Sequence, residues 1–138
     1  MGDTAMRLRF NPAHKGLVQV FGPLEAEIMR LVWQQDHVTV KQVHRALARR
    51  REIAYTTVMT TMSRLADKGV LRRNRQGMAY QYRPAMSRGE FDRWVLRSVL
   101  AGLIETFNTT AVDSLVEYLS QEQPEQLEHL RRSLVRAA

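Results

Sequence analysis

Residues 54–65 constrain this chain more than any other stretch, because they fit a helix with one apolar side and one hydroxyl-rich side. At about 100° per residue, Val58, Met62 and Leu65 fall together, at the i, i+4, i+7 spacing of a helix that packs on a core. The polar residues that gather opposite them are Thr56, Thr57, Thr60, Ser63 and Arg64. Hydroxyls can bond to base edges and arginine can bind guanine or phosphate, so the pattern favours a helix that reads a DNA groove. The alternative is an ordinary solvated face, although Glu, Lys or Gln would suit an exposed helix better than β-branched threonine.

The charge is divided unevenly along the chain. Residues 1–84 carry 15 Lys and Arg against 6 Asp and Glu, whereas residues 85–138 carry 6 against 8. A basic front half indicates a polyanionic partner, and its charges are spread over several predicted elements rather than along one amphipathic helix. Double-stranded DNA therefore fits better than a membrane surface, and the rear half is expected to have a different role.

Composition and motifs exclude several other classes. The chain has 138 residues with 44% apolar content, which predicts a globular protein, and it has no cysteine for a disulfide or a thiolate metal site. The first 15 residues lack the apolar segment of a secretory signal, and residues 94–104 are too short to span a bilayer. The histidines lack metal-ligand spacing, and no nucleophile elbow, phosphate-binding glycine loop or paired acidic motif is visible. We expect a cytoplasmic protein without membrane insertion, cofactor, metal or enzymatic activity.

The front half predicts helices in succession. Residues 1–20 have no clear period and predict a loosely held basic arm, which either contacts phosphate or is disordered. A first helix begins at Pro23, and a short second one is capped by Thr39 and ends in Arg49, Arg50 and Arg51. Those arginines either complement the helix dipole or reach a polyanion. The threonine-rich helix then stops at Gly69, the residue type favoured just past a helix C-terminus.

Beyond Gly69 the period becomes alternating, over residues 70–75 and 78–84 around Gln76-Gly77, which predicts a β-hairpin. Three helices followed by a hairpin make a winged helix-turn-helix, whose third helix enters the major groove. The hairpin residues predicted to meet phosphates are Arg72, Arg73 and Arg75. Lys41 is either a phosphate contact or an exposed lysine, and Tyr55 either touches the DNA backbone or packs at the helix junction. Tyr80 and Tyr82 share a face and are expected to pack in the core.

The rear half predicts amphipathic helices. Ser87 and Glu90 form a capping box at the start of a long helix, and further helices are expected at about 110–121 and after Pro124. Their apolar stripes are too large to be buried on a small winged helix, so we expect a homodimer. The residues predicted for its interface are Phe91, Trp94, Val95, Val99, Leu103, Ile104, Phe107, Leu115, Leu119, Leu127, Leu130 and Leu134.

With these elements in place, residues 20–135 resemble the penicillinase-repressor family of bacterial transcriptional regulators, which includes repressors of beta-lactamase, methicillin-resistance and copper-transport operons. The segments that carry the resemblance are Gly22–Met29 with Trp33, Thr39-Val40 with Val43-His44, Ala54–Val58 with Arg64-Leu65, Lys68–Arg73, and Tyr80–Pro84. Together, in this order and spacing, they are a specific signature.

The resemblance implies a dimeric repressor on a dyad operator, often built on TACA and TGTA, with release by a membrane-bound sensor protease in part of the family. Two departures matter. Ser114–Leu119 occupies the region where cleaved members carry an Asn-Phe bond, and Phe107-Asn108 stands in reverse order. The cysteine cluster of the copper-responsive branch is absent.

The sequence thus predicts a mainly α fold with a small β-hairpin: a basic arm at 1–20, a winged-helix DNA-binding domain at 21–85, and a three-helix dimerisation domain at 86–138. The predicted function is a homodimeric, sequence-specific transcriptional repressor. The alternative is a winged-helix module that binds DNA nonspecifically or binds a protein partner.

Overall fold

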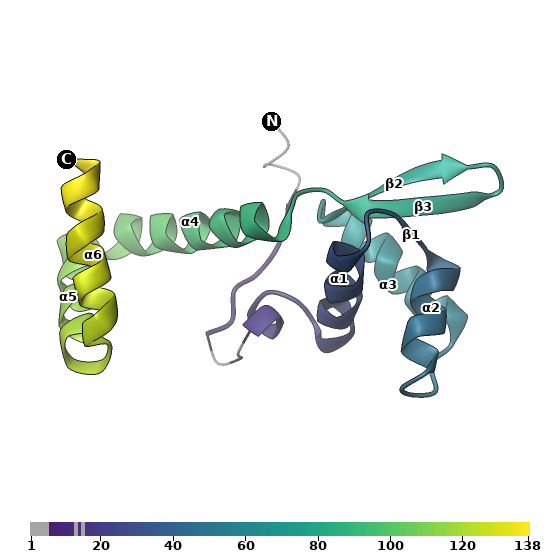
Figure 1. Cartoon of the computed structure of the whole chain (residues 1–138), viewed down its shortest axis with the longest axis horizontal. Helices are drawn as coiled ribbons and strands as arrows, with labels where there is room; N and C mark the ends of the chain where they lie inside the picture. The colour runs from purple at the N-terminus through teal and green to yellow at the C-terminus, as the bar shows by residue number, and fades with distance from the viewer. Residues whose placement is uncertain (1–5, 13, 15) are drawn as a thin grey trace. The chain divides into compact units, whose positions relative to one another are not determined.

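The computed structural model describes residues 6–12, 14 and 16–138, which divide into two compact units, the first ending at Arg93 and the second running from Trp94 to Ala138. The elements of the first unit are η2 (Gly16–Gln19), α1 (Pro23–Gln34), β1 (Val38–Thr39), α2 (Val40–Ala48), α3 (Tyr55–Asp67), β2 (Leu71–Gln76), β3 (Ala79–Pro84) and the start of α4 (Arg88–Phe107). Helices α1, α2 and α3 lie on one side of the β2–β3 hairpin (Figure 1). This arrangement confirms the predicted winged-helix fold.

Side-chain caps begin the helices where the sequence predicts. Thr39 Oγ1 accepts a hydrogen bond from the Gln42 amide at 3.2 Å, and Gln42 Oε1 accepts one from the Thr39 amide at 2.9 Å. Ser87 and Glu90 exchange the same pair of bonds at the start of α4, at 3.0 and 3.1 Å. The bond from the Ser87 amide, and then the bond with its side chain, lower the pKa of Glu90 below its ordinary value. Gly69 follows α3 with φ +84°, in the left-handed region that suits glycine.

The sheet contains a strand that the sequence analysis missed. β1 pairs antiparallel with β3, through Val38 opposite Tyr82 and Thr39 opposite Gln81, and gives the strand order β1-β3-β2. A strand of two residues is too short for an alternating pattern to appear in the sequence. Its position beside β3 is decided by tertiary pairing, and it joins the start of α2 to the hairpin.

The core of the first unit lies between its helices and the sheet. Val58, Met62 and Leu65 of α3 are each 0% exposed, as their periodicity predicts. Phe91 is also buried, with its ring 5.3 Å from Phe21 and 5.2 Å from Trp33 between centroids. Through these aromatic contacts the first turn of α4 packs as part of the winged-helix unit.

The predicted arm falls partly outside the described residues, at 1–5, 13 and 15. Where the chain is described, the expectation of a loose arm is wrong. Met6 and Leu17 are 6% and 5% exposed, and the Arg7 amide donates a hydrogen bond to the Lys68 carbonyl at 3.1 Å. Two isolated apolar residues without a helical or alternating period give no sequence signal, yet they bury against the helices.

The second unit consists of α4 from Trp94 onward, α5 (Thr109–Glu122) and α6 (Pro124–Ala137), close to the predicted bounds. α5 and α6 lie side by side (Figure 1). Neither of these two helices contains a buried residue. The unit therefore has many apolar side chains that are exposed and no buried core of its own.

Candidate nucleic-acid interface

Helix α3 has two chemically distinct sides. Its buried stripe fixes the helix against the first unit, and the side facing solvent carries the predicted groove-reading residues. Thr56, Thr57, Thr60 and Arg64 are exposed and Ser63 is half-buried. These five residues offer hydroxyls and a cation, which can bond to base edges and phosphates, while the carboxylate of Asp67 lies in the last turn of the helix.

Two residues of α3 that the sequence analysis left unassigned have unexpected burial. Met59 is 42% exposed between the threonines, where an apolar side chain can contact a thymine methyl group. Thr61 is only 9% exposed, and its Oγ1 donates to the Thr57 carbonyl at 2.8 Å. The positions on a helical wheel could have predicted the exposure of Met59, since it lies three residues after Thr56 and four before Ser63, on the same side of the helix.

The His44 side chain connects α2 to the turn before α3, a structural role that the sequence analysis did not predict. His44 Nε2 lies 2.8 Å from the Ile53 carbonyl, and its ring meets the Tyr55 ring edge-on at 5.7 Å between centroids. A carbonyl accepts, so this nitrogen carries the proton. Tyr55 packs on His44, which is one of its two predicted roles, and it is still 45% exposed at the first turn of α3. Lys41 is exposed at the start of α2.

The arginines of the hairpin lie on opposite faces of the sheet. Arg73 stands opposite Tyr82, which is buried, so Arg73 projects on the α3 side, whereas Arg72 projects on the other. Arg73 Nη1 donates to Ser63 Oγ at 2.9 Å, Nη2 lies 3.7 Å from Asp67 Oδ1, and the guanidinium sits 5.7 Å from the Tyr80 ring centroid. Hydrogen bonding with Tyr82 is the main cause that raises the pKa of Arg73. Arg73 therefore ties the hairpin to α3.

Near the hairpin turn, Arg75 Nε donates to the Gly77 carbonyl at 3.2 Å, where Gly77 has φ +63°. Tyr80 pairs with Arg75 across the strands and is 49% exposed, so the expectation that it packs in the core is wrong, while Tyr82 at 2% exposure meets it. Tyr80 and Tyr82 lie on the same face of the sheet, and that face is buried only at Tyr82, where the helices cover it. Met78 at the tip is 93% exposed.

Ion pairs within the first unit use some of the basic residues. Arg51 Nη2 lies 2.7 Å from Glu27 Oε2, so this member of the arginine run joins the segment after α2 to α1. Lys68 Nζ lies 2.6 Å from Glu25 Oε2, which links the end of α3 to α1. Among the described residues, neither Arg49 nor Arg50 has an ion pair, and both are exposed. Charge is thus left available on the surface beyond α2.

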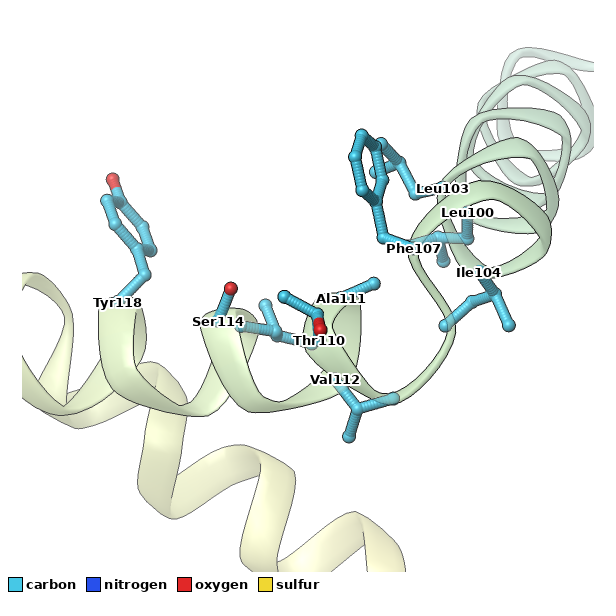
Figure 2. Close-up of a pocket in the computed structure, with 10 residues that line it drawn as sticks. Leu100, Leu103, Ile104, Phe107, Thr110, Ala111, Val112, Ser114 and Tyr118 are labelled. Carbon is cyan, nitrogen blue, oxygen red and sulfur yellow. The ribbon is translucent and has the colours of Figure 1, made fainter.

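The second unit exposes a continuous apolar groove between the end of α4 and α5. It has a volume of 560 Å³, and the residues that line it include Leu100, Leu103, Ile104, Phe107, Val112, Leu115 and Tyr118. Figure 2 shows Leu103 and Phe107 projecting from α4 near Ala111 of α5. Such a large apolar surface on a described unit without a core is typical of an association face.

The predicted interface residues divide into three groups. Leu103, Ile104, Phe107, Leu115 and Leu134 are exposed. Half-buried positions are Trp94, Val95, Val99, Leu119, Leu127 and Leu130. Phe91 differs from all of these, because it is 1% exposed in the core of the first unit and has no surface left for a partner. The capping box fixed the start of α4 correctly but could not show which unit its first turns join.

Within the described residues, His, Asp and Glu side chains form no group able to hold a metal ion. No helix in that part of the chain has the length and apolar character to cross a membrane.

Comparison with known proteins gives matches in both sequence and structure. The family model for the penicillinase repressor matches residues 21–136. The transcriptional regulator BlaI, from two strains of Mycobacterium tuberculosis, is 35% identical over 114 residues, which cover 82% of this chain and 81% of that protein. The DNA-binding domain of the repressor BlaI, solved in solution, aligns with a TM-score of 0.47 and 23% identity, covering 56% of this chain and 93% of that chain.

Proposed function

Because the chain belongs to the penicillinase-repressor family and is a DNA-binding transcriptional repressor, we propose that it acts as a homodimer on a dyad operator. The family consists of regulators and not of enzymes, in keeping with the sequence prediction. The observation that carries the DNA-reading part of the proposal is the two-sided α3, whose apolar stripe is fully buried while its hydroxyl-rich side faces solvent. In a winged helix this is the element that enters the major groove.

The proposed contacts follow from exposure and position. Thr56, Thr57 and Thr60 would meet base edges, with Met59 against thymine methyl groups. Phosphate contacts are assigned to Lys41, Tyr55, Ser63, Arg64, Arg73 and Arg75, which are exposed or half-buried on the helix-turn-helix and the α3 side of the hairpin. Arg73 would act in two ways, because its bond to Ser63 also holds the hairpin against α3. Arg72 is left out, since it projects from the opposite face of the sheet.

We assign dimerisation to the second unit. The sequence predicted a domain boundary between residues 85 and 86, but Phe91 is buried in the first unit, so the boundary is moved to lie between Arg93 and Trp94. The apolar groove beside Leu103 and Phe107 would be covered by a second copy, which has the same groove and can meet it isologously. A two-fold dimer places two α3 helices on half-sites about one helical turn apart, or a multiple of that, which matches a dyad operator.

The pathway around this repressor is also proposed. A repressor acts where the DNA is, so we assign it to the cytoplasm. Release by a membrane-bound sensor protease would require a bond other than Asn-Phe, because the rear helices carry Ser114–Leu119 in that region. Partial digestion of the DNA-bound dimer, followed by mass spectrometry, would show whether a susceptible bond lies at or near Ser114–Leu119 in α5, and an uncut α5 would contradict release by this route.

The test of the proposal is fluorescence anisotropy with the upstream intergenic DNA of its own gene and a scrambled duplex of equal length, over a salt series. Specific recognition predicts that the native sequence binds about a thousandfold more tightly. The affinity should fall with salt by a slope of about −0.9 per phosphate contact. Equal binding of both duplexes with equal salt slopes, repeated over tiled genomic fragments, would contradict sequence-specific repression and favour nonspecific DNA binding.

A further inference from the structure

The three-stranded sheet β1-β3-β2, which we call the wing sheet, has one face that points away from α3. That face carries a row of basic side chains. On β2 and β3, Arg72 stands directly opposite Arg83. Val38 pairs with Tyr82, and the next residue outward on each segment, His37 and Arg83, line the same hollow. One row therefore runs from His37, the residue before β1, to Arg83 of β3 and Arg72 of β2. Side chains alternate between faces, so this row is separate from Arg73, which contacts α3.

The juxtaposition of Arg72 and Arg83 is unfavourable for the isolated protein. Residues directly opposite in an antiparallel pair have Cβ atoms about 4.5–5.5 Å apart, and like charges at this spacing destabilise the sheet. Among the described residues, no carboxylate pairs with either arginine. Asp36 pairs with His37 instead, with its Oδ2 3.7 Å from His37 Nδ1, and its side chain is 98% exposed. An anionic ligand would remove the repulsion.

The row borders a concave, polar space. A hollow of 360 Å³ is lined by His37, Arg72, Asn74, Gln81 and Arg83, and it is also bordered by Arg73, whose side chain contacts α3. Asn74 pairs with Gln81 on the same face, two residues along from the arginine pair. Guanidinium groups bind phosphate through two parallel hydrogen bonds, and side-chain amides can bond to hydroxyl or carbonyl groups next to it. The lining thus combines strong phosphate donors with neutral polar groups.

We propose that this outer face of the wing sheet is a phosphate-binding site, built by Arg72 and Arg83 with His37 at its edge. The group bound is a phosphate ester or pyrophosphate, either on a free phosphorylated ligand or on DNA other than the segment held by α3. Because the site lies on the face opposite α3, it can be filled while α3 occupies a groove. Occupation would link β2, β3 and the residue before β1, and so stiffen the hairpin that Arg73 joins to α3.

The test titrates the full chain with sodium pyrophosphate and monitors the backbone amides by NMR. A parallel titration with sodium chloride of equal ionic strength is the control. Saturable shifts are expected at the outer-face residues of β2 and β3. Arg72→Gln and Arg83→Gln should each weaken binding at least about tenfold, the effect of removing one charge-assisted hydrogen bond. Arg132→Gln, an exposed arginine on α6, is the matched control and should leave it unchanged. Shifts that never saturate, or equal weakening by the control, would overturn the proposal.

A second measurement guards against loss of folding. Arg72→Gln removes a like-charge contact, so its melting temperature without ligand should equal or exceed that of the original protein. Pyrophosphate should raise the melting temperature of the original protein and not that of the variant. A ligand effect that is the same in both would count against the site, whatever the NMR result.

Repeating the titration with saturating duplex distinguishes the two sources of phosphate. If a free ligand fills the site, pyrophosphate binds the DNA complex as well as it binds the protein alone. If DNA backbone fills it, duplex blocks pyrophosphate and Arg72→Gln weakens DNA binding. The titration without DNA tests the site by itself, so its result stands even if operator recognition fails.

Discussion

Replacing Thr60 by alanine tests the assignment of α3 as the reading helix. The residue is exposed, and alanine has the higher helix propensity by up to about 0.7 kcal/mol, so the fold should not lose stability. One hydroxyl contact to a base is worth about 1 kcal/mol, the low end of the range for base readout. Two copies in a dimer on a dyad lose about 2 kcal/mol, which is about thirtyfold in operator affinity, against about fivefold on an isolated half-site.

Thr61→Ala is the matched control, since it removes the same atoms one position along the helix. Its side chain is 9% exposed and bonds to the Thr57 carbonyl, so it cannot reach DNA. Loss of that bond costs about 0.5–1.5 kcal/mol, partly offset by the helix propensity of alanine. The melting temperature of Thr61→Ala should be slightly lower than that of the original protein. Its preference for the operator over the scrambled duplex should be unchanged.

The assay is anisotropy on the operator, a half-site and a scrambled duplex, together with thermal unfolding of each variant. Thr60→Ala should lower operator affinity and leave the affinity for the scrambled duplex unchanged. If it weakens both by the same factor, Thr60 contacts only the DNA backbone. If Thr61→Ala alters discrimination as much as Thr60→Ala does, α3 does not enter the groove with its threonine-rich side.

The other predictions concern the hairpin, the dimer and the first turn of α4. Arg73→Ala should weaken binding to all sequences alike and flatten the salt slope by about 0.9 for each phosphate that the variant no longer binds. A change in base preference at one position would show that the hairpin lies elsewhere. Replacing Leu103 and Ile104 by glutamate should give a monomer in sedimentation and weak binding to half-sites, and an unchanged species would refute the assigned interface. Phe91→Ala should cost about 3–5 kcal/mol of unfolding free energy, because it leaves a cavity beside two rings, and a purely dimeric defect would contradict its burial. Glu90→Gln should be less stable than the original protein above the ordinary pKa of glutamate. That difference should disappear as pH falls through the lowered pKa of Glu90, and a difference constant down to acid pH would contradict the capping role.

Local chemistry in the sequence was sufficient for most elements of the fold. The caps at Thr39 and Ser87 act through residues three positions along the chain, so they can be recognised without tertiary information. The spacing of Val58, Met62 and Leu65 likewise identifies the buried side of α3, because a helix repeats every 3.6 residues whatever covers it. The threonine-rich side then follows as the exposed one, which is why the candidate interface could be predicted.

Tertiary structure alone decided what covers each face. Alternation says that Arg72 and Arg73 point to opposite sides, but only the packing of α3 on the sheet shows that Arg73 is the one that meets it. Phe91 fits an apolar stripe for a partner equally well, until Phe21 and Trp33 are seen to enclose it. A sequence period reports which residues share a face and carries no information about distant segments. Burial and charge pairing depend on those segments, so they had to come from the folded chain.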